Sequence, residues 1–253
     1  MKQYGPATYG DRIAGFYDEH YAALPSADPM IETLARLAGD GCALELGIGT
    51  GRVALPLASR GVLVHGIDAS AAMVDRLYAK PGGDAIPVTI GDFADIAVAG
   101  RYSLIYAVFN TFFVLMSQDD QVRCIASCAA HLDEGGAFLI EAFYPDLTRY
   151  VHGQNVSAAD VGVDHVSLEI TRHDPVQQHL SSQHIHITPN GLEKMFPVNL
   201  RYAWPSEIDL MARLAGLKLE SRSGGWQSEP YTASAGVHVS VYRKPGCAAE
   251  PGA

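Results

Sequence analysis

The chain has 253 residues, of which 48% are hydrophobic and 18% charged, and its formal net charge is −10 at pH 7. This composition excludes a disordered chain, because the apolar content is enough for a folded core of one or two domains. The acidic excess argues against nucleic acid and membranes as partners, since both are bound through basic patches. Residues 1–6 contain no apolar segment, so we expect no signal peptide, and the longest apolar stretch, 102–116, is too short and interrupted to span a bilayer.

The four cysteines form no CxxC pair and no disulfide-dense framework, which is typical of a protein in the reducing cytoplasm. From residue 30 to about 145 the chain alternates helix-like and strand-like segments. Asp28 and Pro29 predict a helix start with Asp28 as the N-cap, and Pro56 predicts a kink or an early-turn position. The expected helices are 28–38, 53–60, 70–77 and 117–132, and the expected strands are 42–46, 62–67, 86–90, 102–109 and 137–142.

This alternation predicts an α/β fold with a doubly wound, mostly parallel sheet covered by helices on both faces. Residues 148–200 follow a different pattern of short alternating strands, which indicates an antiparallel β cap inserted after the fifth strand. A helix at 205–214 and two closing strands, 217–221 and 237–242, then complete a seven-stranded sheet.

The most informative motif is the glycine string after the first strand, Leu44-Glu45-Leu46-Gly47-Ile48-Gly49-Thr50-Gly51-Arg52. Alternating glycines let the backbone approach a ligand closely, and the next helix presents free N–H groups to it. Arg52 stands where the dinucleotide fingerprint has its third glycine, so this is not that motif. Asp68, after the second strand, could accept two hydrogen bonds from a ribose diol. Asp92 and Phe93, after the third, could bind an exocyclic amine and line an adenine slot.

On these motifs, residues 30–145 resemble the class I S-adenosylmethionine-dependent methyltransferases, whose fold is a Rossmann-like seven-stranded sheet. The resemblance implies an enzyme that binds S-adenosylmethionine and releases S-adenosylhomocysteine. It places the loop 47–51 at the methionine part, Arg52 at its carboxylate, Asp68 at the ribose and Asp92 at the adenine. The residues that it implies for cofactor binding are Tyr9, Glu45, Gly47, Gly49, Gly51, Arg52, Asp68, Ala69, Met73, Asp92, Phe93 and Phe109.

A narrower resemblance lies in residues 9–18, Tyr9-Gly10-Asp11-Arg12-Ile13-Ala14-Gly15-Phe16-Tyr17-Asp18. This segment is similar to the opening helix of actinobacterial N-methyltransferases that act on aminosugars and lincosamides. Their two tyrosines, eight residues apart, close over the cofactor, and an antiparallel cap follows the fifth strand. Where Val114 stands, the aminosugar enzymes have a histidine, so this chain departs from a general-base mechanism and favours transfer by proximity and desolvation.

These resemblances give the expected division of the chain and the remaining site residues. We expect Tyr9, Tyr17 and Asn110 to be catalytic by orienting the acceptor or the sulfonium methyl group. The expected substrate-binding residues are Tyr4, Tyr17, Phe113, Tyr144 and Trp226. The expected parts are a lid helix region at 1–29, a cofactor-binding core at 30–147, a cap or substrate insert at 148–200, the end of the core sheet at 201–244 and a disordered tail at 245–253.

Several of these residues also have purely structural interpretations. Tyr9 and Tyr17 could be ordinary amphipathic positions, Asp68 could cap a helix, and Trp226 could pack in the core. His184 and His186 share one face of a strand, but no acid or cysteine stands at ligand spacing. We therefore expect them to be surface or cap residues and expect no metal site.

The sequence therefore predicts a small-molecule methyltransferase, acting on nitrogen in specialised metabolism, in the cytoplasm. The alternatives are an O-methyltransferase, an enzyme that uses the bound cofactor for other chemistry, and a nonenzymatic binding protein. The expected partner is a small-molecule acceptor, with no nucleic acid and no membrane. Exposed cap strands could also pair between subunits in a homo-oligomer.

Overall fold

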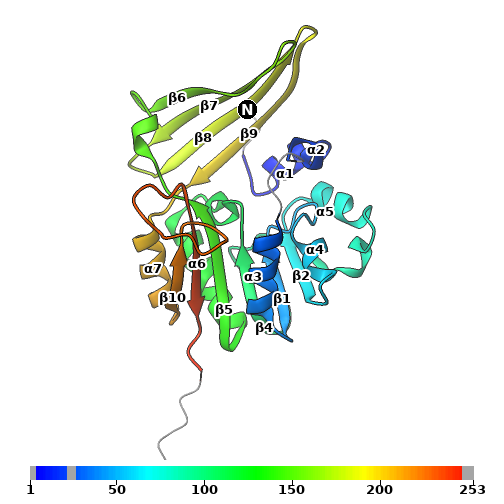
Figure 1. Ribbon diagram of the computed structural model, residues 1–253, viewed down its shortest axis with the longest axis vertical. Coiled ribbons are helices and arrows are strands. Elements are labelled where there is room, and N and C mark those ends of the chain that lie inside the picture. The colour runs from blue at the N-terminus through cyan, green and yellow to red at the C-terminus, as the bar shows by residue number, and fades with distance from the viewer. Residues whose placement is uncertain (1–3, 22–26, 247–253) are drawn as a thin grey trace, which may run out of the picture.

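The computed structural model describes residues 4–21 and 27–246, which form a large sheet with helices on both faces. A smaller sheet lies beyond the carboxyl ends of its parallel strands (Figure 1). The helices are α1 (Thr8–Ile13), α2 (Tyr17–His20), α3 (Asp28–Ala38), α4 (Ala54–Ala58), α5 (Ala71–Tyr78), α6 (Gln118–His131) and α7 (Pro205–Leu214). Three single 3₁₀ turns are η1 (Gly83–Ala85), η2 (Thr111–Val114) and η3 (Leu147–Arg149).

The strands of the large sheet are β1 (Cys42–Leu46), β2 (Leu63–Asp68), β3 (Val88–Ile90), β4 (Tyr102–Ala107), β5 (Leu132–Phe143), β10 (Lys218–Ser223) and β11 (Val237–Arg243). Their order is β10-β11-β5-β4-β1-β2-β3, and β11 alone runs antiparallel to its neighbours. The predicted doubly wound, mostly parallel seven-stranded sheet is thus confirmed. The order reverses between β1 and β4, and ligands of open α/β sheets bind at the carboxyl ends of strands beside such a point.

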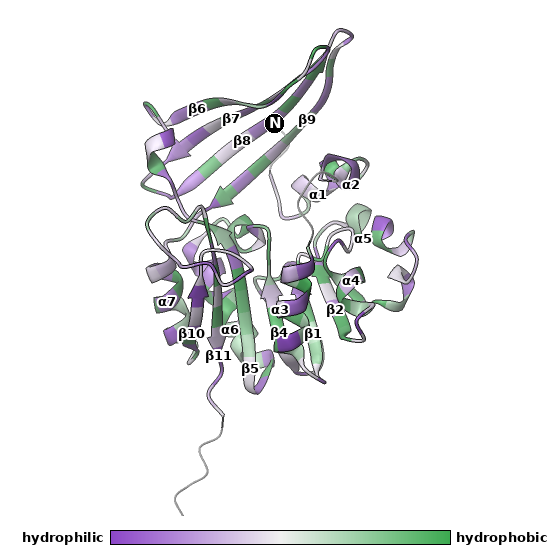
Figure 2. Cartoon of the chain, in the orientation of Figure 1, coloured by the Kyte–Doolittle hydropathy of each residue, from purple (hydrophilic) through white to green (hydrophobic). Residues whose placement is uncertain are grey.

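Two helical layers bury the faces of this sheet. Helices α3 and α4 pack on one face through residues such as Leu34 and Leu57, whereas α6 and α7 pack on the other through Ile125 and Ile208. The central strands between these layers are largely apolar, and Figure 2 colours most of β1, β4 and β5 green, whereas β10 at the edge is largely purple. This double burial makes the central strands a rigid base for the loops at their carboxyl ends.

Local sequence signals account for most helix ends. Ser70 and Ser117 are the N-caps of α5 and α6, and Pro56 lies in the first turn of α4, where no intrahelical hydrogen bond is lost. The prediction that Asp28 caps α3 is wrong. Ala27 occupies the N-cap position and Asp28 is already helical, because Pro29 fits the first turn at either of its early positions.

The opening helix divides into two short helices, α1 and α2, rather than one. Residues 14–16 form a turn between them, and Phe16 adopts a non-helical conformation that carries its ring to Phe196 of the small sheet, 5.5 Å away between centroids. The contact with the small sheet therefore bends the N-terminal segment.

The small sheet is the antiparallel cap that the sequence predicted. Its strands, in spatial order, are β6 (Gln154–Val161), β7 (Val166–Asp174), β8 (His179–Thr188) and β9 (Gly191–Arg201). Helix α1 lies between cap and core, where Ile13 packs with Met73 of α5 and Phe196 of β9 (Figure 1). The expected tail, 245–253, lies outside the described residues from 247 onward. Across the described ranges, no helix is long and apolar enough to cross a membrane.

Candidate active site

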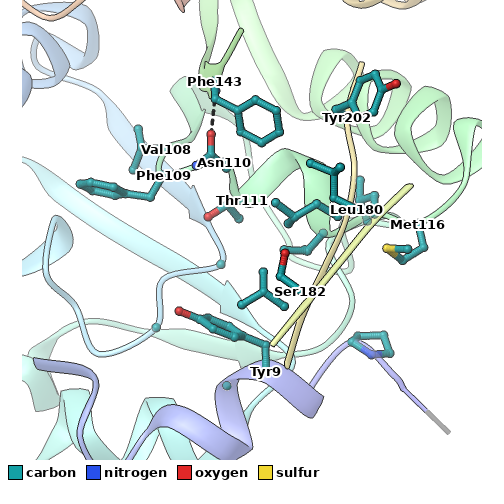
Figure 3. A pocket seen from close by; sticks show the side chains of 18 of the residues that line it. Tyr9, Val108, Phe109, Asn110, Thr111, Met116, Phe143, Leu180, Ser182 and Tyr202 are labelled. Carbon is teal, nitrogen blue, oxygen red and sulfur yellow. Dashed lines mark hydrogen bonds between the residues drawn. The ribbon is translucent and has the colours of Figure 1, made fainter. Parts of the chain in front are cut away.

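A cavity of about 840 Å³ lies between the carboxyl ends of β1, β2 and β4, the two N-terminal helices and the inner face of the cap. In Figure 3, Tyr9 from α1, Thr111 from η2 and Ser182 from β8 approach this space from three sides. Small-molecule pockets typically have volumes of about 300–1,000 Å³, so this cavity is large enough for two reactants side by side.

The glycine loop forms the floor of the cavity where β1 ends. Gly47 and Gly49 line the cavity with φ of +69° and +55°, a backbone region that strongly favours glycine. A Cβ at Gly47 would lie 2.5 Å from Cγ2 of Thr111. The third glycine, Gly51, does not line the cavity. Its φ is +78° and a Cβ there would lie 2.3 Å from Leu77, so packing alone requires glycine at this position, and the expected place of Gly51 at the cofactor stays a prediction.

Asp68 holds the glycine loop and the start of α5 together. Its Oδ2 accepts a hydrogen bond from the Gly49 amide at 2.7 Å, and its Oδ1 accepts one from the Ser70 amide at 2.8 Å. Burial raises the pKa of Asp68, although these two hydrogen bonds oppose the shift. Ser70, not Asp68, is the N-cap of α5. Asp68 lines the cavity, and its carboxylate, which also accepts a hydrogen bond from the Ala69 amide, keeps acceptor capacity for a ligand.

Arg52 is poised to bind an anion. Its guanidinium carbon lies 3.4 Å from the ring centroid of Phe109, and both residues line the cavity. Its Nε and Nη2 atoms are buried and have no hydrogen-bond partner among the described residues. Buried polar atoms nearly always have partners, so this pair of donors fits a bound carboxylate.

Glu45 is the other ionisable group beneath the cavity. It is almost completely buried and accepts a hydrogen bond from the Tyr106 hydroxyl at 2.9 Å. Burial raises the pKa of Glu45 to about 8, so the carboxyl holds a proton at neutral pH unless a cation comes close. Asp92 lines the cavity and accepts a hydrogen bond from the Ala94 amide at 2.9 Å. Three further expected cofactor residues also line it: Ala69, Met73 and Phe93.

Three tyrosines close the cavity from the N-terminal side. The hydroxyls of Tyr9 and Tyr21 lie 3.1 Å apart, and the rings of Tyr17 and Tyr21 are 4.7 Å apart between centroids. Burial raises the pKa of Tyr17 to about 12 and that of Tyr9 further, so both hydroxyls stay protonated and are able to donate hydrogen bonds. Sequence analysis missed Tyr21, although its spacing of four from Tyr17 places the two on one helix face.

Asn110 lies at the carboxyl end of β4 in a left-handed conformation, with φ of +62°. Its Oδ1 accepts a hydrogen bond from the Phe143 amide at 2.7 Å (Figure 3). This bond ties the loop after β4 to the end of β5 and uses one Oδ1 lone pair. Asn110 lines the cavity, so its Nδ2 is the side-chain group best suited to a ligand.

Two of the expected substrate walls lie elsewhere. Phe113 is fully buried and packs on Phe143, 5.0 Å away between centroids, because the 3₁₀ turn η2 directs its ring into the core. Trp226 does not line the cavity either. It packs against the core on the α3 side and hydrogen-bonds the Glu141 carboxylate. The other two expected walls, Tyr4 and Tyr144, do line the cavity.

The cap supplies a group of cavity residues that sequence analysis did not assign to the site. They lie at alternate positions of neighbouring strands, the pattern of one sheet face. These residues are Glu169 of β7, Leu180, Ser182 and His184 of β8, and Val198 and Leu200 of β9. The alternation of these residues was visible in the sequence. The sequence does not show, however, which face of the cap sheet turns toward the cavity. No group of three or more metal-binding side chains occurs within the described ranges.

Comparison with known proteins identifies the family. Residues 43–136 match the family described as "Methyltransferase domain". The CcbJ methyltransferase from Streptomyces caelestis has the same fold with a TM-score of 0.88 and 38% sequence identity, over 96% of this chain and 100% of that one. The chain belongs to the S-adenosylmethionine-dependent methyltransferases.

Two further methyltransferases are similar to this one. The cypemycin N-terminal methyltransferase of a Streptomyces species is 29% identical over 193 residues, 75% of this chain and 78% of that one. CalS10 from Micromonospora echinaspora, an amino pentose methyltransferase with S-adenosylmethionine bound, matches 90% of this chain and 96% of its own with a TM-score of 0.68. Its 17% identity shows the shared fold alone. The predicted family, fold class and cofactor are therefore confirmed.

The cavity fits this cofactor. Arg52 offers two unpaired buried donors where the methionine carboxylate is expected, and Gly47 and Gly49 bring backbone without side chains to the cavity wall. The acidic side chains Asp68 and Asp92 face the same cavity from β2 and from the loop after β3. One cavity thus combines an anion site with carboxylates suited to a ribose and an adenine.

Proposed function

We propose that this methyltransferase transfers the methyl group to a nitrogen atom of a small natural-product amine. The observation that carries the proposal is one continuous cavity that joins the cofactor residues to the inner face of the cap. The lid tyrosines stay protonated, and Val114, which lines the cavity, stands where the resemblance to the aminosugar enzymes implies a histidine. A hydroxyl acceptor usually needs a strong base, whereas an amine lone pair attacks without one.

Each part of the chain has a role in this proposal. S-adenosylmethionine, when bound, supplies a methyl group activated by a sulfonium. Arg52 would hold its carboxylate, Asp68 its ribose, and Asp92 with Phe93 its adenine. Tyr9, Tyr17 and the Nδ2 of Asn110 would orient the acceptor and exclude water, so that rate enhancement comes mainly from alignment, which can be worth up to about 7–11 kcal/mol. The cap, 148–200, would hold the acceptor, and the N-terminal region, 1–29, would serve as the lid.

The compared proteins support nitrogen as the acceptor atom. The cypemycin enzyme is named for methylation of an N-terminus, and CalS10 for an amino pentose of calicheamicin biosynthesis. The same comparisons suggest an acceptor from specialised metabolism. The cytoplasmic location and a homo-oligomer formed through the cap stay predictions.

The test incubates the full chain with S-adenosylmethionine and a panel of amino sugars, prolyl amides and short peptides, each paired with its hydroxyl analogue. We expect S-adenosylhomocysteine to form with at least one amine and not with its hydroxyl analogue. Turnover of hydroxyl analogues alone would identify an O-methyltransferase. Binding of the cofactor without any methylated product would favour other chemistry in this cavity.

A further inference from the structure

The inner face of the cap carries a small group of polar side chains in an otherwise apolar wall. Glu169 of β7 and His184 of β8 are directly opposite each other in the antiparallel register, and both line the cavity. Side chains paired in this way lie on the same face of a sheet, with Cβ atoms about 4.5–5.5 Å apart. Their neighbours on this face are Leu180, Val198 and Leu200.

Glu169 is held in place by two hydroxyl groups. Its Oε1 accepts hydrogen bonds from Thr171 at 3.2 Å and from Ser182 at 3.4 Å, and these two hydroxyls lie 2.8 Å apart. Its Oε2 has no hydrogen-bond partner among the described residues. A carboxylate fixed on one side and open on the other, in a partly apolar wall, favours a cation as its ligand.

His184 is fixed by stacking rather than by hydrogen bonds. Its ring lies parallel to that of Phe196, 4.9 Å away with an interplanar angle of 5°. Within the described part of the chain, neither ring nitrogen has a hydrogen-bond partner. Burial lowers the pKa of His184 while the charge of Glu169 opposes the shift, so the imidazole is neutral at pH 7 and can accept a proton.

Three elements face His184, and two of them carry a titratable group there. β7 contributes Glu169, and α2 contributes His20, whose ring also contacts Phe196 at 5.4 Å. Burial, followed by the charge of His184, lowers the pKa of His20 as well. On β9, the residue opposite His184 is the uncharged Phe196. Lys194 of the same strand forms an ion pair with Glu19, with a distance of 3.3 Å between the nitrogen and the oxygen. Glu169 is therefore the negative charge that acts on this imidazole.

We propose that Glu169 and His184 form the amine subsite of this methyltransferase, in which Glu169 binds the acceptor as an ammonium ion and His184 accepts its proton. The inference rests on the proposed N-methylation. Alkylamines have a pKa of about 10, so most of the acceptor arrives protonated and without a lone pair for attack.

In the proposed step, the ammonium ion of the acceptor gives one proton to His184, which leaves a neutral amine and an imidazolium ion. The amine nitrogen then forms a bond to the methyl carbon while the carbon–sulfur bond breaks, and its electron pair stays on sulfur. The sulfonium becomes a neutral thioether, and the product nitrogen takes up the positive charge. His184 returns its proton to solvent when the product leaves.

A binding experiment tests the subsite without turnover. The full chain, labelled at histidine and saturated with S-adenosylhomocysteine, is titrated with cyclohexylamine or cyclohexanol while the imidazole resonances are followed by NMR. We expect cyclohexylamine alone to shift the His184 resonance, and Glu169→Gln to abolish the shift. His186, on the same strand face but outside the cavity, should not respond. An unmoved His184 resonance would overturn the inference.

Turnover provides the second readout, with whichever amine the panel identifies. His184→Gln should lower kcat at pH 7 by about 10²-fold, and the deficit should shrink as the pH nears the pKa of the free amine. Glu169→Gln should mainly raise KM, by about tenfold. His186→Gln and Glu193→Gln, both outside the cavity, are the matched controls.

The outcomes separate the two proposals. A wild-type kcat and pH profile in His184→Gln would overturn the proton-accepting role while N-methylation stands. A His184 resonance that responds to cyclohexylamine, with no amine methylated by the wild-type protein, would support the subsite and overturn the proposed function. A deficit in His184→Gln that is the same at every pH would indicate a purely structural role and contradict the inference.

Discussion

The hydroxyl of Thr50 in the glycine loop donates a hydrogen bond to Oδ1 of Asp18 in α2, at 2.6 Å. Oδ2 of Asp18 forms an ion pair with Lys80 at 2.8 Å, and Lys80 also donates to the Thr50 carbonyl oxygen. Helix α2 is therefore attached directly to the loop at the floor of the cavity. Because the attachment stands beside the proposed cofactor residues, opening of the proposed lid and release of the cofactor product are expected to be coupled.

We predict that Asp18→Asn accelerates release of S-adenosylhomocysteine by roughly twofold to fivefold, since a partly exposed ion pair contributes up to about 1 kcal/mol. Burial raises the pKa of Asp18, but the hydrogen bonds from Lys80 and Thr50 outweigh it and lower the pKa overall. The attachment is thus intact at neutral pH and is lost as the pH falls through that lowered pKa. Stopped-flow fluorescence measures the release rate. An unchanged rate in Asp18→Asn, equal to that of the exposed control Asp75→Asn, would contradict the coupling.

We predict that Glu45 releases a proton when the cofactor binds. Its pKa is raised from 4.5 to about 8, so the folded protein holds a proton between these values that the unfolded chain has lost. Stability contributed by this group therefore falls as the pH rises from 4.5 to 8. The ammonium of the cofactor, placed nearby, would favour the carboxylate and expel the proton.

Calorimetry in two buffers of different ionisation enthalpy measures this release. At pH 7 we expect up to one proton to leave per S-adenosylmethionine bound, and Glu45→Gln to abolish the release. The control Glu193→Gln, at the far end of the cap, should behave as wild type. Heats that are independent of the buffer in the wild-type protein would show that Glu45 does not titrate on binding.

Arg52→Gln tests the anion site. Loss of a charged partner from a buried hydrogen-bonded pair costs about 2–5 kcal/mol, so the affinity for S-adenosylhomocysteine should fall at least about 30-fold. Adenosine, which lacks the methionine part, is the internal control, and its affinity should not change. A parallel loss for both ligands would place Arg52 at the nucleoside or in the fold rather than at the carboxylate.

Tyr9→Phe and Tyr17→Phe remove only the lid hydroxyls. Each should lower turnover by up to about tenfold, the value of one hydrogen bond, with little change in cofactor affinity. Steady-state rates and calorimetric affinities measure the two effects, and Tyr78→Phe, on the exposed side of α5, is the control. Wild-type turnover in both variants would remove these hydroxyls from the reaction.

The cofactor side of the cavity was predictable because strand order alone gathers its residues. Glu45, Asp68 and Asp92 follow or end consecutive parallel strands, and the carboxyl ends of such strands meet at one edge of the sheet. Gly51 shows the limit of this reasoning. A glycine string indicates a close backbone approach, but the sequence does not show whether a ligand or, as here, Leu77 fills the space.

The acceptor side could not be predicted to the same extent. Phe113 and Trp226 lie in a 3₁₀ turn and an irregular loop, where no periodicity fixes the direction of a side chain. In the cap, the alternation of β8 was clear, but the inward face depends on docking against α1 and the core. The interpretation of His184 as a cap residue was therefore correct, whereas its position in the cavity came only from the structure.

The most direct test of the account uses S-adenosylmethionine labelled with carbon-13 in its methyl group and the acceptor that the panel identifies. NMR of the product shows by the carbon shift whether the label is bound to nitrogen or oxygen. The account predicts one labelled N-methyl group for each S-adenosylhomocysteine formed. A label on oxygen, or S-adenosylhomocysteine formed without any labelled acceptor, would contradict it.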